Sequence, residues 1–307
     1  MSHRFDHSDY RVTPGEDPNL SDRPTRANVK GFEKADALEA LQEDRVRLAE
    51  TQRVLYADGS RAMLIIFQAL DAAGKDGTIR HVMSGVNPQG CRVSSFKAPT
   101  AEEAAHHFLW RPTPHLPAKG HIAIFNRSYY EETLVVRVHP QWLASQKLPE
   151  EVLPSRYLTA EGLAEGGPPK SFWRKRYDAI NGYERLLSDS GTRIVKFFLH
   201  VSRDEQKERF LERIQRPEKN WKFSAGDIRE RQHWNEYQTV YADTLQHTST
   251  DQAPWYVIPA DQKWFSRALV GDIIAETISG MDLQYPTLPD DEAAKLKAAE
   301  QQLLAED

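Results

Sequence analysis

The sequence has little cysteine and no long apolar run, and both absences narrow the class of protein. Its 307 residues include a single cysteine, Cys91, so no internal disulfide can form and we expect an intracellular, cytoplasmic protein. No apolar run reaches the roughly 18 residues that a membrane-spanning helix requires. Residues 1–22 are polar and lack the pattern of a secretory signal. We therefore expect a protein that does not use a membrane.

Neither positive nor negative residues are in large excess. The formal net charge is −5, with 40 Lys and Arg against 45 Asp and Glu. This balance argues against a protein whose whole surface binds nucleic acid or an anionic membrane. Any polyanion must therefore bind in a local basic groove.

Short apolar strands alternate with helical patterns along most of the chain. Strands are expected at residues 62–68, 91–96, 121–126, 192–201 and 254–259. Helical patterns fall at residues 32–56, 75–86, 100–110, 171–187, 203–216, 263–281 and 290–307. This alternation predicts an α/β fold, a doubly wound parallel sheet covered on both faces. Ligands bind such sheets at the carboxyl ends of the strands.

The run from Met63 to Thr78 (MLIIFQALDAAGKDGT) joins an apolar strand to a small-residue loop, a lysine and a helix start. Backbone N–H groups and the helix N-terminus attract an anion there, and the lysine adds positive charge. Ala69 replaces the usual first glycine, and Asp76 replaces the hydroxyl that normally holds magnesium. The residues expected to contact phosphate are Ala72, Ala73, Gly74, Lys75, Asp76, Gly77 and Thr78.

Asp71 places a carboxylate inside this anion-binding loop. It would repel a phosphate by about 4 kcal/mol at about 4 Å, for an effective dielectric constant near 20. A bridging divalent metal offsets that repulsion most simply, and the substitution at Asp76 moves the expected metal site toward Asp71. The alternatives are that Asp71 caps the helix or pairs with Lys75.

A second polar cluster follows the strand at 121–126. Asn126 can offer its carbonyl oxygen to a metal, and Glu131 or Glu132 can supply the charge that an amide lacks. Arg127 would hold a phosphoryl oxygen in its fork. The competing interpretations are a structural ion pair for Arg127 and a solvent-exposed helix position for Glu131.

The charged segment from Arg203 to Lys222 has the pattern of a mobile lid. Its basic residues recur at helical spacing or continue beyond Pro217: Arg209, Arg213, Arg216, Lys219 and Lys222. Glutamates between them leave a self-paired, solvated helix as the alternative. Basic residues near other expected element ends are weaker candidates for phosphate contact: Arg80, Lys97, Arg137, Lys175 and Arg176.

Taken together, these motifs make residues 32–285 resemble the family-2 polyphosphate kinases. The motifs that carry the resemblance are LDAAGKDGT (70–78), GVNPQG (85–90), SFKAP (95–99), FNRSYY (125–130) and RPEKNWK (216–222). The first motif is weak alone, but the set in this order is specific. The resemblance implies a P-loop kinase fold with a helical lid. It implies Mg²⁺-dependent phosphoryl transfer, with Mn²⁺ as a substitute ion, between inorganic polyphosphate and a nucleotide.

Carried over by position, the resemblance implies that Asp71 and the Asn126 site hold magnesium, while Lys75 and Arg127 grip phosphates. Glu131 joins this set as a candidate catalytic residue and metal ligand. Much of the family has Asp where this chain has Asn126, which leaves the number of metal ions open. Members with Asn-Arg followed by Glu at the position of Glu131 use both AMP and ADP, which favours both as acceptors and ATP as a product. A homodimer or homotetramer is expected by the same resemblance.

These inferences divide the chain into a polar, loosely attached N-terminal arm (1–31), a P-loop kinase-like domain (32–285) with its lid at about 203–240, and a tail helix (286–307). Two rival functions remain. An ATP-dependent nucleotide kinase of the thymidylate kinase type shares the loop, the strand-end arginine and the Arg-rich lid. A non-catalytic phosphate-binding module would keep Lys75 but has no need of Asp71 or Glu131. Base preference, direction of reaction and polymer length are not set by the sequence.

Overall fold

The computed structural model of the protein describes residues 4–27 and 29–306, apart from the side chain of Lys222. Its strands form one five-stranded sheet in the order β2-β3-β1-β4-β5, and every neighbouring pair is parallel. The strands are β1 (Ala62–Gln68), β2 (Cys91–Ser95), β3 (Ile122–Asn126), β4 (Thr192–His200) and β5 (Trp255–Pro259). The predicted doubly wound α/β fold is confirmed.

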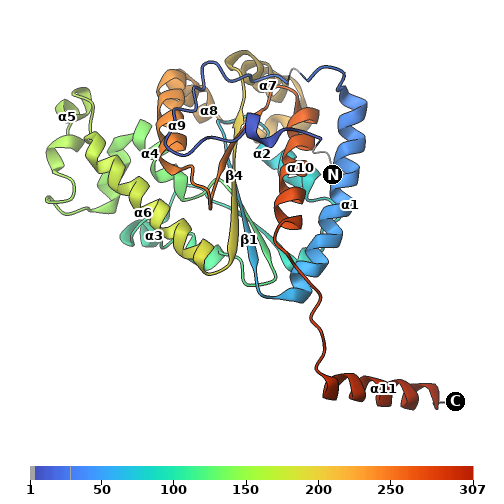
Figure 1. Cartoon of the computed structure of the whole chain (residues 1–307). Helices are drawn as coiled ribbons and strands as arrows, with labels where there is room; N and C mark the ends of the chain where they lie inside the picture. The colour runs from blue at the N-terminus through green and yellow to red at the C-terminus, as the bar shows by residue number, and fades with distance from the viewer. Residues whose placement is uncertain (1–3, 28, 307) are drawn as a thin grey trace.

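Helices cover both faces of this sheet (Figure 1). One face carries α1 (Lys34–Asp58), α2 (Lys75–Val82) and α10 (Lys263–Ser279). The other face and the lid carry α3 (Ala101–Ala105), α4 (Val135–Val138), α5 (Ala160–Ala164), α6 (Lys170–Asp189), α7 (Arg203–Gln215), α8 (Ala225–Glu230) and α9 (Trp234–Thr248). Helix α11 (Asp290–Leu304) projects away from the rest of the fold, as expected for a tail helix.

Alternate residues of the central strand β1 point to opposite faces of the sheet. Met63, Ile65 and Phe67 pack into the core cluster beneath α1 and α10. Leu64 and Ile66 pack into the opposite cluster with α6 and α9. Each fully buried side chain of this kind stabilises the fold by about 1.5–3 kcal/mol. A strand buried on both faces must sit in the middle of the sheet, and this position fixes where the loop after Gln68 emerges.

The N-terminal segment is not a loose arm over residues 4–27, and that expectation was wrong. Phe5, Val12 and Leu20 are buried. The backbone N–H of Val12 donates to Trp255 O at 2.9 Å, and that of Val257 donates to Tyr10 O at 2.8 Å. The segment thus covers the exposed edge of β5, which would otherwise present unpaired backbone groups. Its few apolar residues, scattered among polar ones, were the overlooked signal.

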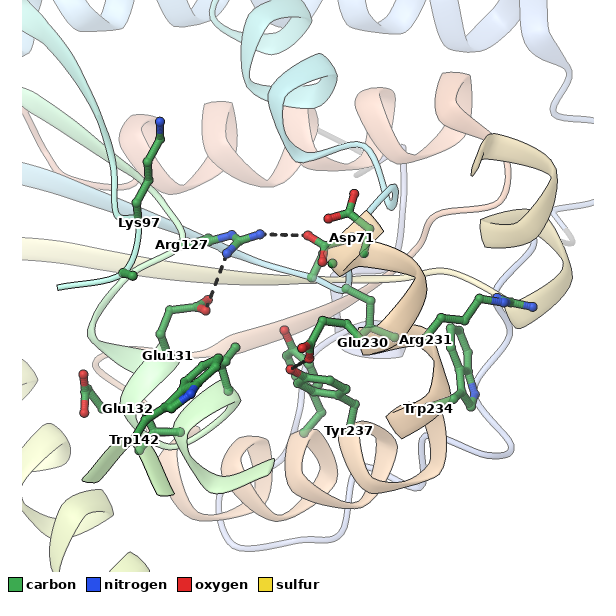
Figure 2. Close-up of a pocket in the computed structure, with 18 of the residues that line it drawn as sticks. Asp71, Lys97, Arg127, Glu131, Glu132, Trp142, Glu230, Arg231, Trp234 and Tyr237 are labelled. Carbon is green, nitrogen blue, oxygen red and sulfur yellow. Dashed lines mark hydrogen bonds and ion pairs between the residues drawn. The ribbon is translucent and has the colours of Figure 1, made fainter. Parts of the chain in front are cut away.

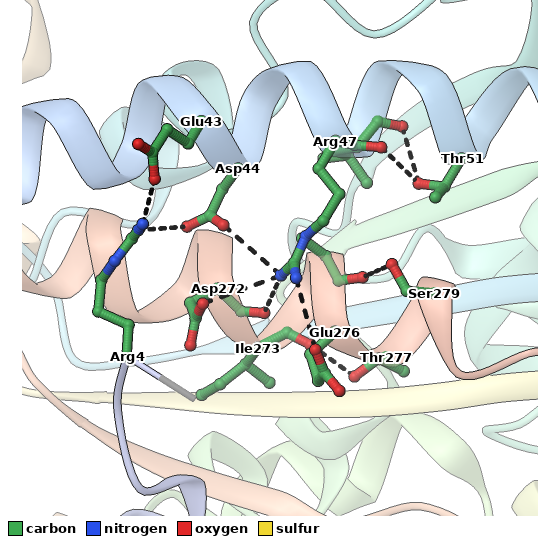
Figure 3. A network of polar contacts seen from close by, with 12 residues as sticks. Arg4, Glu43, Asp44, Arg47, Thr51, Asp272, Ile273, Glu276, Thr277 and Ser279 are labelled. Atoms are coloured by element: carbon green, nitrogen blue, oxygen red, sulfur yellow. Dashed lines mark hydrogen bonds and ion pairs between the residues drawn. The ribbon is translucent and has the colours of Figure 1, made fainter. Parts of the chain in front are cut away.

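Helices α1 and α10 meet closely, and a polar network joins them to the N-terminal segment (Figure 3). A β-carbon at Gly271 would lie 3.1 Å from Leu41 Cδ1, so any larger residue there would require the Leu41 side chain to shift. Asp44 lies in the contact, with Arg47 at 3.5 Å and Arg4 at 3.7 Å. Burial, more than any charge, raises the pKa of Asp44 to about 6.

This pKa predicts that Asp44→Asn stabilises the protein at neutral pH. The folded state binds the Asp44 proton more tightly than the unfolded chain does, so stability falls as pH rises from about 4 to about 6 and stays lower above that. The shift of about two pKa units corresponds to about 3 kcal/mol at most. We expect a higher midpoint of chemical unfolding for Asp44→Asn at pH 8 and no gain at pH 4.

Glu39→Gln is the matched control, because Glu39 is exposed on the same helix. Its unfolding midpoint is expected to match that of the unmodified protein at both pH values. A loss of stability for Asp44→Asn at pH 8 would show that the charged carboxylate is needed by its arginine partners.

Helix α9 was not predicted as an element of its own. Its buried positions, Tyr237, Val240, Tyr241, Thr244 and Leu245, follow helical spacing. None of the helices in the described part of the chain combines the length and apolar character that a bilayer span requires.

Candidate active site

The loop after β1 has the backbone geometry expected of an anion cradle and lies at the carboxyl end of the sheet. Gly74 precedes α2 with φ 109°, and Ala72 adopts φ 62°, so two residues of the loop are left-handed. Only glycine adopts such angles without strain, and a strained non-glycine residue marks a tightly held backbone. Helix α2 begins at Lys75, which directs its first N–H groups into the loop. Ala73, Asp76, Gly77 and Thr78 complete the predicted cradle.

Lys75 is almost fully enclosed by this loop. Its side chain is 8% exposed, and its Nζ donates to the carbonyl oxygen of Ala69 at 2.7 Å. Burial, together with the smaller effect of the Arg127 charge, lowers the pKa of Lys75 to about 8. A buried ammonium group with one backbone partner can offer its other protons to an incoming phosphate.

Asp71, Arg127 and Glu131 form the charged centre of the site (Figure 2). Arg127 NH2 donates to Asp71 Oδ1 at 2.7 Å, and its NH1 lies 3.9 Å from Glu131 Oε2. Burial raises the pKa of Glu131, against the opposing effect of Arg127. Asp71 thus pairs with Arg127 and not with Lys75, and Glu131 is not a solvent-exposed helix residue.

Asn126 faces the loop from the end of β3. Its Nδ2 donates to Asp76 Oδ1 at 2.7 Å, so the residue that replaces the usual loop hydroxyl binds the amide at the strand end. The next residue, Arg127, has φ 62°, and its N–H donates to Phe67 O at 3.0 Å. The ends of β1 and β3 are therefore tied together where their polar side chains meet.

Helix α7 of the lid contacts the backbone of the loop that follows β1. Arg209 is 5% exposed, and its NH1 donates to Ala72 O at 3.1 Å and Ala73 O at 2.7 Å. Its remaining donors reach Glu205, Ala260 and Asp261. The lid pattern predicted phosphate contact for Arg209, but here its guanidinium braces the backbone of the cradle. Spacing alone could not distinguish a brace from a phosphate ligand.

The other predicted basic residues lie in several places. Arg213 on α7 lies 3.4 Å from Asp227. Lys219 donates to Glu212 at 2.6 Å, and Arg216 pairs with Glu212 and Glu218. These two follow the self-paired alternative.

Outside the lid, Arg137 binds Asp243 and Tyr177, and Arg176 binds Glu132. Arg80 and Lys175 are exposed, and Lys97 lines the cavity. The side chain of Lys222 lies outside the described residues.

A cavity of about 300 Å³ opens beside this charged centre. The residues singled out from the sequence that line it are Asp71, Lys97, Arg127, Glu131 and Glu132. Residues that the sequence analysis did not single out also line it, among them Arg111, Trp142, Asp227, Glu230, Arg231, Trp234, Tyr237 and Tyr241. The helical spacing of α9 was the signal that could have revealed Tyr237 and Tyr241. A mixed aromatic and charged wall suits a ligand with a planar ring and a phosphate.

The oxygen donors at this centre fit a hard divalent cation. Mg²⁺ takes oxygen ligands and is usually held by one or two carboxylates together with substrate phosphates and water. Asp71 and Glu131 supply carboxylates and Asn126 an amide oxygen. The described residues contain no ready-made cluster of three acidic, His or Cys ligands. A metal here would therefore depend on phosphate oxygens for part of its shell.

Comparisons of the sequence with known proteins lead to one family. The sequence profile described as polyphosphate kinase 2 matches residues 31–152 and 166–286. An ADP-polyphosphate phosphotransferase from Rhodopseudomonas palustris is 48% identical over 295 residues, covering 96% of this chain and 97% of that protein. An AMP/ADP-polyphosphate phosphotransferase from Meiothermus ruber is 45% identical over 279 residues, covering 90% and 94%.

A solved structure leads to the same family. The crystal structure of polyphosphate kinase 2 from Arthrobacter aurescens superposes with a TM-score of 0.80 at 36% identity, covering 95% of both chains. The resemblance drawn from the sequence motifs, and the fold it implied, are therefore confirmed. Polyphosphate kinases are generally dependent on a divalent metal, in keeping with the oxygen donors described above. The chain belongs to the polyphosphate kinase 2 family.

Proposed function

We propose that this protein transfers a phosphoryl group between inorganic polyphosphate and adenine nucleotides, converting AMP to ADP and ADP to ATP in a reversible reaction. The observation that carries the proposal is Arg127, which bridges the carboxylates of Asp71 and Glu131 beside an anion cradle and a cavity. Relatives named for polyphosphate and for AMP or ADP support the choice of substrates.

Phosphoryl transfer requires the protein to align the reacting groups and to neutralise their charge, and it does not require a covalent intermediate with the protein. Lys75 and the N–H groups at the start of α2 would hold one phosphate, and Arg127 would hold the transferring group. Asp71, with Asn126 and Glu131, would hold Mg²⁺, and the bound ion would neutralise part of the phosphate charge. The aromatic wall from Trp142 and α9 would receive the nucleotide.

The loop departs from the common ATP-binding pattern at two positions. These departures bear on whether ATP or polyphosphate is the phosphoryl donor. Ala69 stands in place of the first glycine, and Asp76 stands in place of the metal-binding hydroxyl. Asp76 binds Asn126, so it is already engaged at the base of the site. The comparisons do not favour the thymidylate kinase alternative, because the related proteins are named polyphosphate phosphotransferases.

The direct test measures ATP by luciferase from purified protein, Mg²⁺ and polyphosphate, with ADP and AMP in separate wells. ATP from both supports the dual-acceptor proposal, and ATP from ADP alone removes AMP from it. Wells without polyphosphate report contaminating nucleotide kinases, and so does Lys75→Ala protein purified in the same way. No ATP from folded protein in either well would overturn the proposal.

Arg213→Ala is expected to weaken polyphosphate use more than stability. Arg213 is 22% exposed at its side chain and faces Asp227, which lines the cavity. Loss of a charge-assisted contact to a bound phosphate costs about 1.5–3 kcal/mol, so the KM for polyphosphate should rise at least roughly tenfold. Steady-state kinetics at saturating ADP measure this directly.

Lys207→Ala is the control, since Lys207 is exposed on the same helix. It should leave the KM for polyphosphate within about twofold. A lowered melting temperature for Arg213→Ala with unchanged kinetics would instead assign Arg213 to the ion pair with Asp227.

A further inference from the structure

A buried charged network lies directly behind the turn that carries Arg127 and Glu131. Lys196 on β4 is fully buried, and Glu184 on α6 is 2% exposed. The Lys196 Nζ donates to Glu184 Oε2 at 2.6 Å, to the Tyr130 hydroxyl at 2.8 Å and to Thr248 O at 2.7 Å. All three ammonium protons therefore have partners.

The second carboxylate oxygen of Glu184 receives two hydroxyls from consecutive residues. Tyr129 OH and Tyr130 OH each donate to Glu184 Oε1 at 2.8 Å. Both rings are buried, and burial followed by the Glu184 charge raises the pKa of each hydroxyl well above its ordinary value. The tyrosines therefore remain neutral donors at any working pH.

Stability alone does not account for such a pair. A buried ion pair loses its hydration, and apolar residues of similar volume in its place are often neutral or stabilising. The surrounding cluster is otherwise apolar and aromatic, with Trp255 packed edge-on against Tyr130. A charge pair with every donor and acceptor satisfied in such a core fixes one arrangement of its neighbours more strictly than apolar packing does.

The neighbours that this network fixes belong to the active site. Tyr129 and Tyr130 open the short 3₁₀ turn Tyr129–Glu132. Arg127, just before this turn, holds a φ of 62°, a conformation that costs free energy in a non-glycine residue. The hydroxyls of Tyr129 and Tyr130 bind Glu184. Arg127 and Glu131, from the same segment, line the cavity (Figure 2).

We propose that the Glu184–Lys196 pair is a positioning device that holds Arg127 and Glu131 in register with Asp71 through the hydroxyls of Tyr129 and Tyr130. The role of these two side chains in transfer rests on the proposed function, but their placement does not. Lys196 also reaches the end of α9 through Thr248 O, so the same ammonium group ties the turn to the helix that carries the aromatic wall.

The test removes the two hydroxyls and leaves the ion pair intact. The double variant Tyr129→Phe/Tyr130→Phe is expected to lower kcat at least about tenfold per folded molecule, while the KM for ADP changes less than about threefold. The KM for ADP should change less than kcat because the variant leaves the cavity residues of α8 and α9 in place. The matched control is Tyr183→Phe, whose hydroxyl binds Thr113 at 3.0 Å beside the Tyr129 ring, and its kcat should stay within twofold.

Hydrogen–deuterium exchange gives a readout that does not need activity. Amide exchange at residues 127–133 should rise at least about tenfold in the double variant but not in Tyr183→Phe. Unchanged exchange together with kcat within twofold of the control would overturn the positioning role. An inactive unmodified protein with the predicted exchange pattern would overturn the proposed function alone. If the double variant does not fold, Tyr129→Phe alone should lower kcat at least threefold, and a smaller loss would overturn the role.

Discussion

Lys75→Ala will lower kcat/KM for polyphosphate by at least about a hundredfold, the range found when a preorganised charged donor is removed from a transferring group. The residue lies at the first position of α2 with its ammonium group inside the loop. Arg127 binds the carboxylate of Asp71, and Arg209 binds the loop carbonyls, so the guanidinium groups of both are engaged outside the position of the Lys75 ammonium group. The loss should therefore not be made up by a neighbour.

The pH dependence of the same rate constant gives an independent check on Lys75. A pKa of about 8 means that the free protein loses this positive charge as pH rises through 8. Because kcat/KM reports groups of the free enzyme, it should fall on the alkaline side with an apparent pKa near 8. A bound polyanion favours the charged form, so the corresponding fall in kcat should lie at higher pH.

Lys170→Ala is the control for this prediction, since Lys170 is an exposed residue at the start of α6. It should retain activity within twofold. Lys75→Ala with near-normal kcat/KM, or an alkaline limb that persists unchanged in that variant, would contradict the role assigned to the ammonium group.

The elements that local pattern determines were predicted well. Strand β1 runs from Ala62 to Gln68 as expected, because an unbroken apolar run with Gly and Ser before it has few alternatives. Thr100 caps α3 as expected, with Glu103 completing a capping box. That helix nevertheless ends at Ala105 and not near Trp110, since His106 leaves the helical conformation. Helix ends depend on tertiary contacts that a window of sequence does not contain.

The site was predicted in the same uneven way. The loop follows β1, and Arg127 and Glu131 follow β3, which is a neighbour of β1 in the sheet. The rule that parallel strand ends share one edge therefore brings them together. The far wall of the cavity comes from α8 and α9, whose distance from the loop depends on how the lid folds back. Likewise, Arg209 and Arg213 share one helical face, but only packing decides that Arg209 is buried against backbone carbonyls. Residue type and spacing do not show how deeply each of these side chains is buried.

Asp71→Asn is the second change expected to have a large effect, lowering turnover at least about tenfold. The substitution keeps the shape of the side chain and one acceptor for Arg127, whose NH2 lies 2.7 Å from Asp71 Oδ1. It removes the negative charge that a divalent cation would require beside the cradle. The Mg²⁺ concentration for half-maximal activity should rise accordingly.

The same charge change separates a metal ligand from a structural partner of Arg127. Without metal, Asp71 repels a phosphate at about 4 Å by about 4 kcal/mol for an effective dielectric constant near 20. Asp71→Asn should therefore bind polyphosphate more tightly than the unmodified protein in EDTA, yet turn it over more slowly in Mg²⁺.

Calorimetric titration in EDTA measures the binding of polyphosphate, and steady-state kinetics in Mg²⁺ measure its turnover. The control is Asp189→Asn, at the exposed end of α6. If Asp71 serves only to hold Arg127, the variant will bind polyphosphate more weakly in EDTA, because Arg127 is no longer fixed, and its Mg²⁺ requirement will not change.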